Sequence, residues 1–172
     1  MSGNPCEGCP VSCCLKMGLF LPKSEFSQHF QRHEEVLVIR QIGKIFVVSP
    51  KEGQVCPYLH NGGCRIYHER PIDCRVYPYI MSHIIEKRNR VKIVFHTRSD
   101  CPKKSELYHL MPESEARALI IAFGKKIYGE SKTIIAHRES GILSQFCNRF
   151  EARLSRSLNK MTLRWKKILS KK

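Results

Sequence analysis

The sequence predicts an α+β fold in which a cysteine-rich front part is followed by a helical rear part. Eight of the nine cysteines lie between Cys6 and Cys101. Short apolar runs in the same region alternate with Gly and Pro turns, which is typical of β-hairpins. After residue 102, apolar residues recur at helical spacing instead. We therefore expect residues 1–104 to form a cysteine-cluster metal-binding domain and residues 105–172 to form a helical extension.

The first elements are predicted to be short. Residues 1–17 combine Cys, Gly and Pro without apolar periodicity, so they indicate a loop. Leu19 to Leu21 is a candidate strand. Ser24 is a candidate N-cap for a helix over residues 25–33.

Two β-hairpins are predicted next. The first covers residues 35–50 and turns at residues 41–43, which are Gln41, Ile42 and Gly43. The second joins residues 75–85 to residues 91–97 through a charged turn. The intervening residues 51–74 are rich in Gly and Pro, which favours turns between cysteines.

Three helices are predicted in the rear part. Pro112 suits the first position of a helix, and Gly129 suits its C-terminal end. A shorter helix is expected over residues 131–139. A last amphipathic helix is expected over roughly residues 142–169, with an apolar stripe and basic residues on its other faces.

Length and charge limit the class of protein. The chain has 172 residues, 30 Lys plus Arg and 15 Asp plus Glu, which gives a formal charge of +15. This length is enough to bury a core without disulfides. Residues 149–172 contain nine basic residues and a single acidic one. The sequence lacks an apolar run of about 18 residues, which excludes a transmembrane helix. It also lacks the apolar core of a signal peptide, so we expect a cytoplasmic protein.

The cysteines point to metal ligation. In a reducing compartment, cysteines at motif-like spacing favour metal binding over disulfides. The C-x-x-C pair Cys6 and Cys9 can place two thiolates on one centre. The neighbours Cys13 and Cys14 point to opposite faces of an extended segment, which suits two centres or two atoms of one cluster. Cys147 is expected to be a spectator. The predicted ligands are Cys6, Cys9, Cys13, Cys14, Cys56, Cys64, Cys74 and Cys101.

The identity of the metal stays open at this point. Eight thiolates can form two four-sulfur zinc sites, or one iron–sulfur cluster (for example a 4Fe–4S cluster) plus a further site. Spacing alone does not choose between them. Arg65, Arg70 and Arg75 lie among the second group of cysteines, where cations would offset thiolate charge. Tyr67 is expected to pack beside these loops.

A long block of the sequence resembles a known family. The block runs Cys56-Pro57-Tyr58-Leu59, then Cys64-Arg65-Ile66-Tyr67, Arg70-Pro71 and Cys74-Arg75. Together with the first four cysteines it is similar to the YkgJ-type cysteine-cluster proteins, also described as CxxCxxCC or zinc- or iron-chelating domains. The resemblance covers roughly residues 6–102. This chain has three residues between Cys9 and Cys13, where the named pattern has two.

The resemblance implies chelation of zinc or iron and leaves catalysis undecided. Some relatives are described as iron–sulfur oxidoreductases, and flagellin lysine methylases have a similar cysteine pattern. The chain shows no dinucleotide-binding, P-loop or nucleophile-elbow motif. Three hypotheses follow: a metal-binding protein for binding, storage or electron transfer, a structural zinc module that presents a basic helix to nucleic acid, and an iron–sulfur redox or modifying enzyme.

The basic C-terminal segment has three interpretations. It can be a solvated helix face, a phosphate-binding surface for nucleic acid, or an amphipathic end that binds an anionic membrane surface. The candidate anion-binding residues are Arg164, Lys166, Lys167, Lys171 and Lys172.

Overall fold

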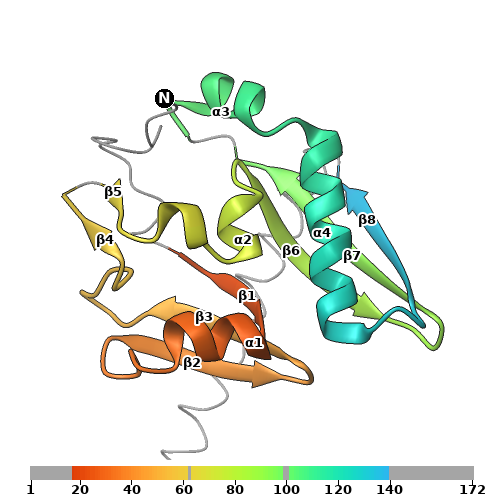
Figure 1. Cartoon of the computed structure of the whole chain (residues 1–172), viewed down its shortest axis with the longest axis horizontal. Helices are drawn as coiled ribbons and strands as arrows, with labels where there is room; N and C mark the ends of the chain where they lie inside the picture. The colour runs from red at the N-terminus through yellow and green to blue at the C-terminus, as the bar shows by residue number, and fades with distance from the viewer. Residues whose placement is uncertain (1–16, 62, 99–100, 140–172) are drawn as a thin grey trace, which may run out of the picture. The chain divides into compact units, whose positions relative to one another are not determined.

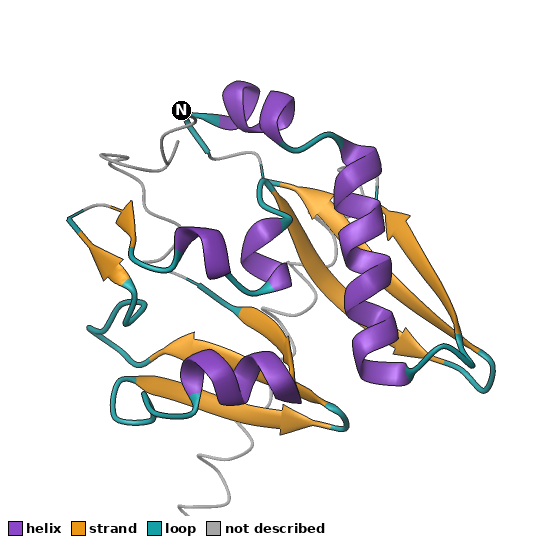
Figure 2. Ribbon diagram, in the orientation of Figure 1, coloured by secondary structure: helices purple, strands orange, loops and turns teal. Residues whose placement is uncertain are grey.

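The computed structural model describes residues 17–61, 63–98 and 101–139 and confirms the mixed α+β class. Figures 1 and 2 show helices together with separate β-sheets, of which there are three within the described residues. The two predicted strand pairs are present, but each is joined by a third strand. The predicted loop over residues 1–16 and the predicted helix over residues 142–169 lie outside the described residues.

The first sheet has the strand order β1-β3-β2. Strand β1 is Leu19–Pro22, β2 is Leu37–Ile42 and β3 is Ile45–Pro50. The predicted turn at residues 41–43 lies slightly later, because Ile42 still pairs with Ile45. Gly43 has a φ of +58° there, a conformation that few residues other than glycine adopt readily.

A short helical segment follows β1 and covers this sheet. It consists of α1 (Lys23–Glu25) and the π-helical turn η2 (Phe26–Phe30). The ring of Phe26 stacks on that of Phe46 with a centroid distance of 4.2 Å. The predicted N-cap at Ser24 is wrong. Pro22, whose extended conformation ends β1, takes the capping position, so the helix starts and ends earlier than expected.

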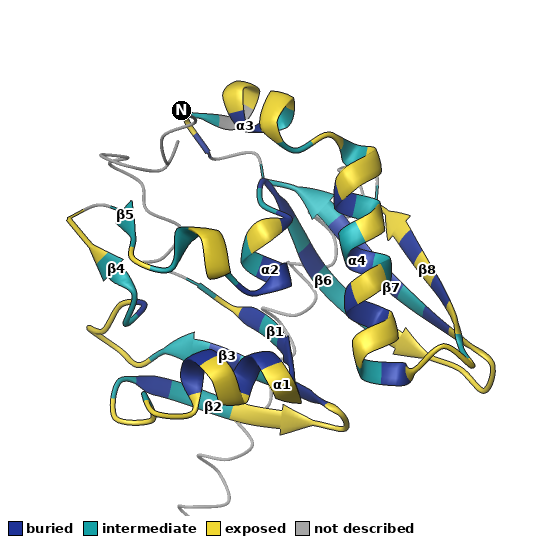
Figure 3. Ribbon diagram, in the orientation of Figure 1, coloured by how far each residue is buried: buried dark blue, intermediate teal, exposed yellow. Residues whose placement is uncertain are grey.

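The second large sheet has the order β6-β7-β8 and is covered by helix α4 (Glu113–Tyr128) (Figure 1). Strand β6 is Tyr79–Glu86 and β7 is Arg90–Thr97. Figure 3 shows buried positions along α4 and the strands beneath it. Gly129, with a φ of +81°, follows the last residue of α4 as predicted.

The expected short helix over residues 131–139 is wrong, because this segment forms strand β8 (Thr133–Arg138). Its burial alternates with a period of two, since Ile134 and Ala136 are buried while Ile135 is exposed. The N–H of Thr133 donates to the carbonyl of Asn89 at 3.0 Å, in the turn between β6 and β7. Pairing at the sheet edge therefore decided the conformation of this short segment.

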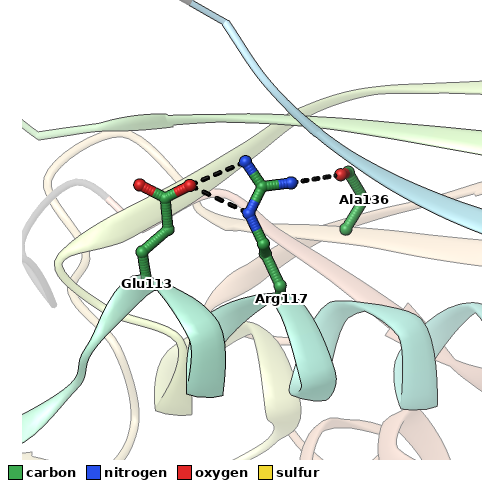
Figure 4. Close-up of polar contacts among 3 residues, drawn as sticks. All are labelled: Glu113, Arg117 and Ala136. Atoms are coloured by element: carbon green, nitrogen blue, oxygen red, sulfur yellow. Dashed lines mark hydrogen bonds and ion pairs between the residues drawn. The ribbon is translucent and has the colours of Figure 1, made fainter.

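Helix α4 is fixed to β8 by Arg117, as Figure 4 shows. The guanidinium donates to the Ala136 carbonyl at 2.7 Å and to Glu113 Oε1 at 2.6 and 2.8 Å. Helix α3 (Lys104–Leu110), which the sequence analysis did not predict, precedes α4. Among its described side chains, Leu107 is buried and the others are exposed or half-buried, so the sequence has no apolar stripe from which this helix could be predicted.

The turn-rich segment between the sheets contains small elements of its own. Strands β4 (Leu59–His60) and β5 (Gly63–Cys64) form a short hairpin. They are followed by the 3₁₀ turn η3 (Tyr67–Glu69) and by helix α2 (Ile72–Arg75).

Helix α2 joins the two halves of the described fold. Ile72, its first residue, and Val76, which directly follows the helix, share a core with Ile120 and Phe123 of α4. Figure 1 shows α2 between β1 and α4. Packing thus continues across residue 104, while the predicted division into domains at that residue stays a prediction. Among the described residues, no helix is long and apolar enough to cross a membrane.

Candidate metal site

Four of the eight predicted ligands lie within the described residues. Cys56 and Cys101 are buried, while Cys64 and Cys74 are half-buried, and all four are thiols rather than disulfides. Cys6, Cys9, Cys13, Cys14 and the expected spectator Cys147 lie outside the described residues.

The β4–β5 hairpin brings Cys56 and Cys64 close to each other in space. Cys64 lies opposite Leu59 in the hairpin. The N–H of Leu59 in turn donates to the carbonyl of Cys56 at 2.9 Å. The hairpin is closed further by the N–H of Arg65, which donates to the Tyr58 carbonyl at 2.9 Å. Two cysteines separated by seven residues therefore face a common neighbour, Tyr58.

Tyr58 is a site residue to which the sequence analysis gave no role. Its hydroxyl donates to the carbonyl of His29 at 2.5 Å. Its ring meets those of Phe30 and His33 edge-to-face. Burial raises the pKa of the Tyr58 phenol above its usual 10.0, and negative charge on Cys56 and Cys64 raises it further. The tyrosine thus links both thiols to η2.

Cys74 reaches the same region from helix α2. Cys74 and Tyr58 both pack against the apolar core that contains Cys56, Leu21 and Phe30. Cys101 is buried just before α3. Within the described ranges, no three His, Cys, Asp or Glu side chains form a group that could hold a metal ion.

Two buried carboxylates hold the start of α2. Glu25 Oε2 accepts the N–H of Ile72 at 3.1 Å, and its Oε1 pairs with Lys126 Nζ at 2.8 Å. Asp73 Oδ2 accepts the N–H of Phe20 at 2.8 Å. Burial raises the pKa of Asp73 from 3.8 to about 7; the Phe20 N–H opposes this shift and the Glu25 charge adds to it. No local pattern in the sequence indicates this pair, because its members are 48 residues apart.

The predicted arginines have contacts with aromatic and imidazole groups. The guanidinium of Arg70 lies 3.8 Å from the ring centroid of Tyr67, and its Nε donates to the Tyr67 carbonyl at 2.8 Å. Arg65 lies 2.9 Å from His60 Nδ1. Arg75 is the exposed last residue of α2. The prediction that these arginines offset thiolate charge stays a prediction.

An open pocket lies at the β4–β5 hairpin and the residues that follow it. It has a volume of about 570 Å³ and is lined by residues 60–61 and 63–69, which include Cys64 and Tyr67. The half-buried thiol of Cys64 therefore lies at a surface that small molecules can reach.

The donor chemistry is suited to zinc or iron. Thiolates are ligands that both metals accept, as single ions or in clusters. Because the described residues do not bring three ligands together, the described thiols require further donors to complete a four-coordinate centre.

Comparison with known proteins gives one match. Residues 5–106 match the family model CxxCxxCC, described as "Putative zinc- or iron-chelating domain". The matched range contains all eight predicted ligands and ends before α4. The searches of curated proteins and of solved structures returned no significant match.

Proposed function

This chain belongs to the CxxCxxCC family, and we propose that it binds zinc or iron through its eight front cysteines in the cytoplasm. One observation carries the proposal. Cys56 and Cys64 both lie close enough to Tyr58 to raise its pKa, and Tyr58 and Cys74 pack against the same apolar core. Three thiols from one segment, residues 56–74, thus lie around one apolar core, although the described residues do not bring three ligands together at a metal position. Cys101 and the quartet of Cys6, Cys9, Cys13 and Cys14 would contribute the remaining donors.

The arrangement favours tight binding over free exchange with solvent. Cys56 is buried, and Cys64 and Cys74 are half-buried, so a bound ion would be only partly hydrated. Two four-sulfur zinc sites use eight thiolates, as does one iron–sulfur cluster together with a second site. Either centre suits metal binding or storage, and the cluster also suits electron transfer.

Purification without oxygen, followed by elemental analysis, tests the proposal. Stoichiometric zinc in a colourless protein would support the zinc form. Iron and sulfide with broad absorption near about 400 nm would support the cluster. A protein without metal, in which all nine thiols react, would contradict the proposal. Cys74→Ser should lower the metal content, whereas Cys147→Ser is the matched control and should not.

A second candidate function rests on the charge of residues 149–172, where nine basic residues accompany one acidic residue. We propose that this segment, including Arg164, Lys166, Lys167, Lys171 and Lys172, binds nucleic acid through its phosphates. Such binding should weaken steeply with salt, because counterions are released on association. Between about 50 and 200 mM salt, a typical site with several phosphate contacts loses about a thousandfold in affinity for DNA. An affinity for a DNA duplex that stays constant over this range would exclude the proposal.

A further inference from the structure

We propose that Lys126 and Glu25 are positioning residues for Cys74, so that helix α4, beyond the family match, determines how tightly the metal site binds. The inference rests on the proposed function, in which Cys74 is a ligand. It follows from one chain of contacts that connects α4 to the first residue of α2.

The first step is the attachment of α2. This helix has only four residues, Ile72–Arg75, so its own hydrogen bonds hold it weakly. The N–H of Ile72 is buried and donates to Glu25 Oε2. A helix begins with N–H groups that lack intrahelical partners, and here Glu25 provides one acceptor from a distant segment. Cys74 is two residues further along the same short helix.

The second step is the charge of Glu25. Its side chain is 8% exposed, and Lys126 Nζ lies 2.8 Å from its other oxygen. Burying a carboxylate is costly unless a cation pairs with it. The pairing with Lys126 therefore holds the Glu25 side chain in place to accept the Ile72 N–H.

The third step is the rigidity of the element that presents Lys126. Helix α4 buries Ala116, Ile120 and Phe123 against the second core. Residues Ile72 and Val76 belong to the same core, so α2 already rests on α4. The Lys126–Glu25 pair adds a directional contact to this apolar one and fixes the orientation of α2.

The chain offers matched controls for each step. Lys125 is the neighbour of Lys126 and pairs with the exposed Glu130, so Lys125→Met removes a lysine of α4 without affecting Glu25. Arg117→Met weakens α4 at its contact with β8 and controls for general loss of stability. Glu25→Gln removes the buried charge but keeps an oxygen for the Ile72 N–H.

The metal-free, reduced full chain gives the first readout. In Lys126→Met, amide exchange of Ile72 and alkylation of Cys74 should both accelerate, while Lys125→Met should match the wild type. Glu25→Gln combined with Lys126→Met should restore the slower rates, because the neutral amide needs no cation. Lys126→Arg should also retain them. Unchanged Ile72 exchange in Lys126→Met would overturn the inference, and this result does not depend on metal binding.

Zinc affinity, measured by competition with a chromophoric chelator, gives the second readout. Groups that orient a ligand typically change metal affinity by about 10- to 100-fold, so Lys126→Met should bind zinc at least about tenfold more weakly. Cobalt(II) spectra should change with it. If Arg117→Met, at equal apo stability, weakens zinc binding as much, the inference is wrong. A wild-type chain that binds no zinc or cobalt would instead contradict the proposed function.

Discussion

Burial changes the chemistry of Asp73. Its pKa rises to about 7 although its oxygen accepts the Phe20 N–H, because loss of hydration outweighs that hydrogen bond. A carboxyl that is readily protonated can keep the same hydrogen bond through its unprotonated oxygen. The proximity of Glu25 makes a second full charge at this place unfavourable.

The stability of the protein should therefore depend on pH through Asp73. Its folded pKa of about 7 lies above the ordinary 3.8, so the folded state binds the proton more tightly. The stabilisation from tighter proton binding is fully present below the unfolded pKa. It is lost as pH rises through the folded pKa, and the total loss is a few kcal/mol at most. Wild type should lose stability relative to Asp73→Asn between about pH 4 and 7. Urea unfolding of both metal-free, reduced proteins measures this, and a difference that is constant with pH would contradict it.

Tyr58 should contribute to stability through its hydroxyl. Tyr58→Phe keeps the ring contacts with Phe30 and His33 but removes the donor to the His29 carbonyl. We expect the free energy of unfolding to fall by about 1 kcal/mol in urea titrations. Tyr67→Phe is the control, because the contacts of Tyr67 with Arg70 involve its ring and its carbonyl. Equal effects of the two substitutions would refute the assigned role.

At the scale of elements, the close approach of α4 to β8 depends on Gly124. A Cβ at this position would lie 2.5 Å from Ile134 Cγ2 and 3.1 Å from Ile93 Cδ1. Glycine is therefore required here by packing, even though it is a poor helix former. The same contact explains how a strand of six residues can be held at the sheet edge.

Gly124→Ala should destabilise the protein despite the better helix propensity of alanine. Overpacking in a filled core costs about 1–3 kcal/mol, which exceeds the propensity gain of about 1 kcal/mol. Thermal unfolding should show a lower Tm for this variant. Gly18→Ala is the control, since a Cβ there meets nothing within 4 Å. A higher Tm for Gly124→Ala would show that α4 and β8 separate easily.

The elements differ in how well the sequence reveals them. Helix α4 was predicted because its apolar residues recur over four turns and Gly129 follows it. Strand β8 was predicted as a helix because a segment of six residues is too short to distinguish the two periods. Ser24 was predicted as a cap because Ser is a common one, yet the end of strand β1 at Pro22 set the start of the helix.

At the scale of the whole molecule, metal binding should be coupled to folding. The proposed ligands extend from Cys6 to Cys101, so one or two centres would connect segments that are remote in sequence. Removing the metal with a chelator under reducing conditions should lower the Tm and accelerate amide exchange in β4, β5 and α2 first. Exchange in β6 and β7 should change less, because none of the described cysteines belongs to their core. An unchanged Tm after complete removal would contradict this coupling.

The sequence by itself determined the family, the α+β class and the two main strand pairs, since these depend on local spacing and residue type. Only the tertiary structure decided that β8 is a strand, that Tyr58 lies beside Cys56 and Cys64, and that Lys126 reaches Glu25. The physical reason is separation along the chain. Lys126 and Glu25 are 101 residues apart, and no local pattern records a contact that two packed cores create.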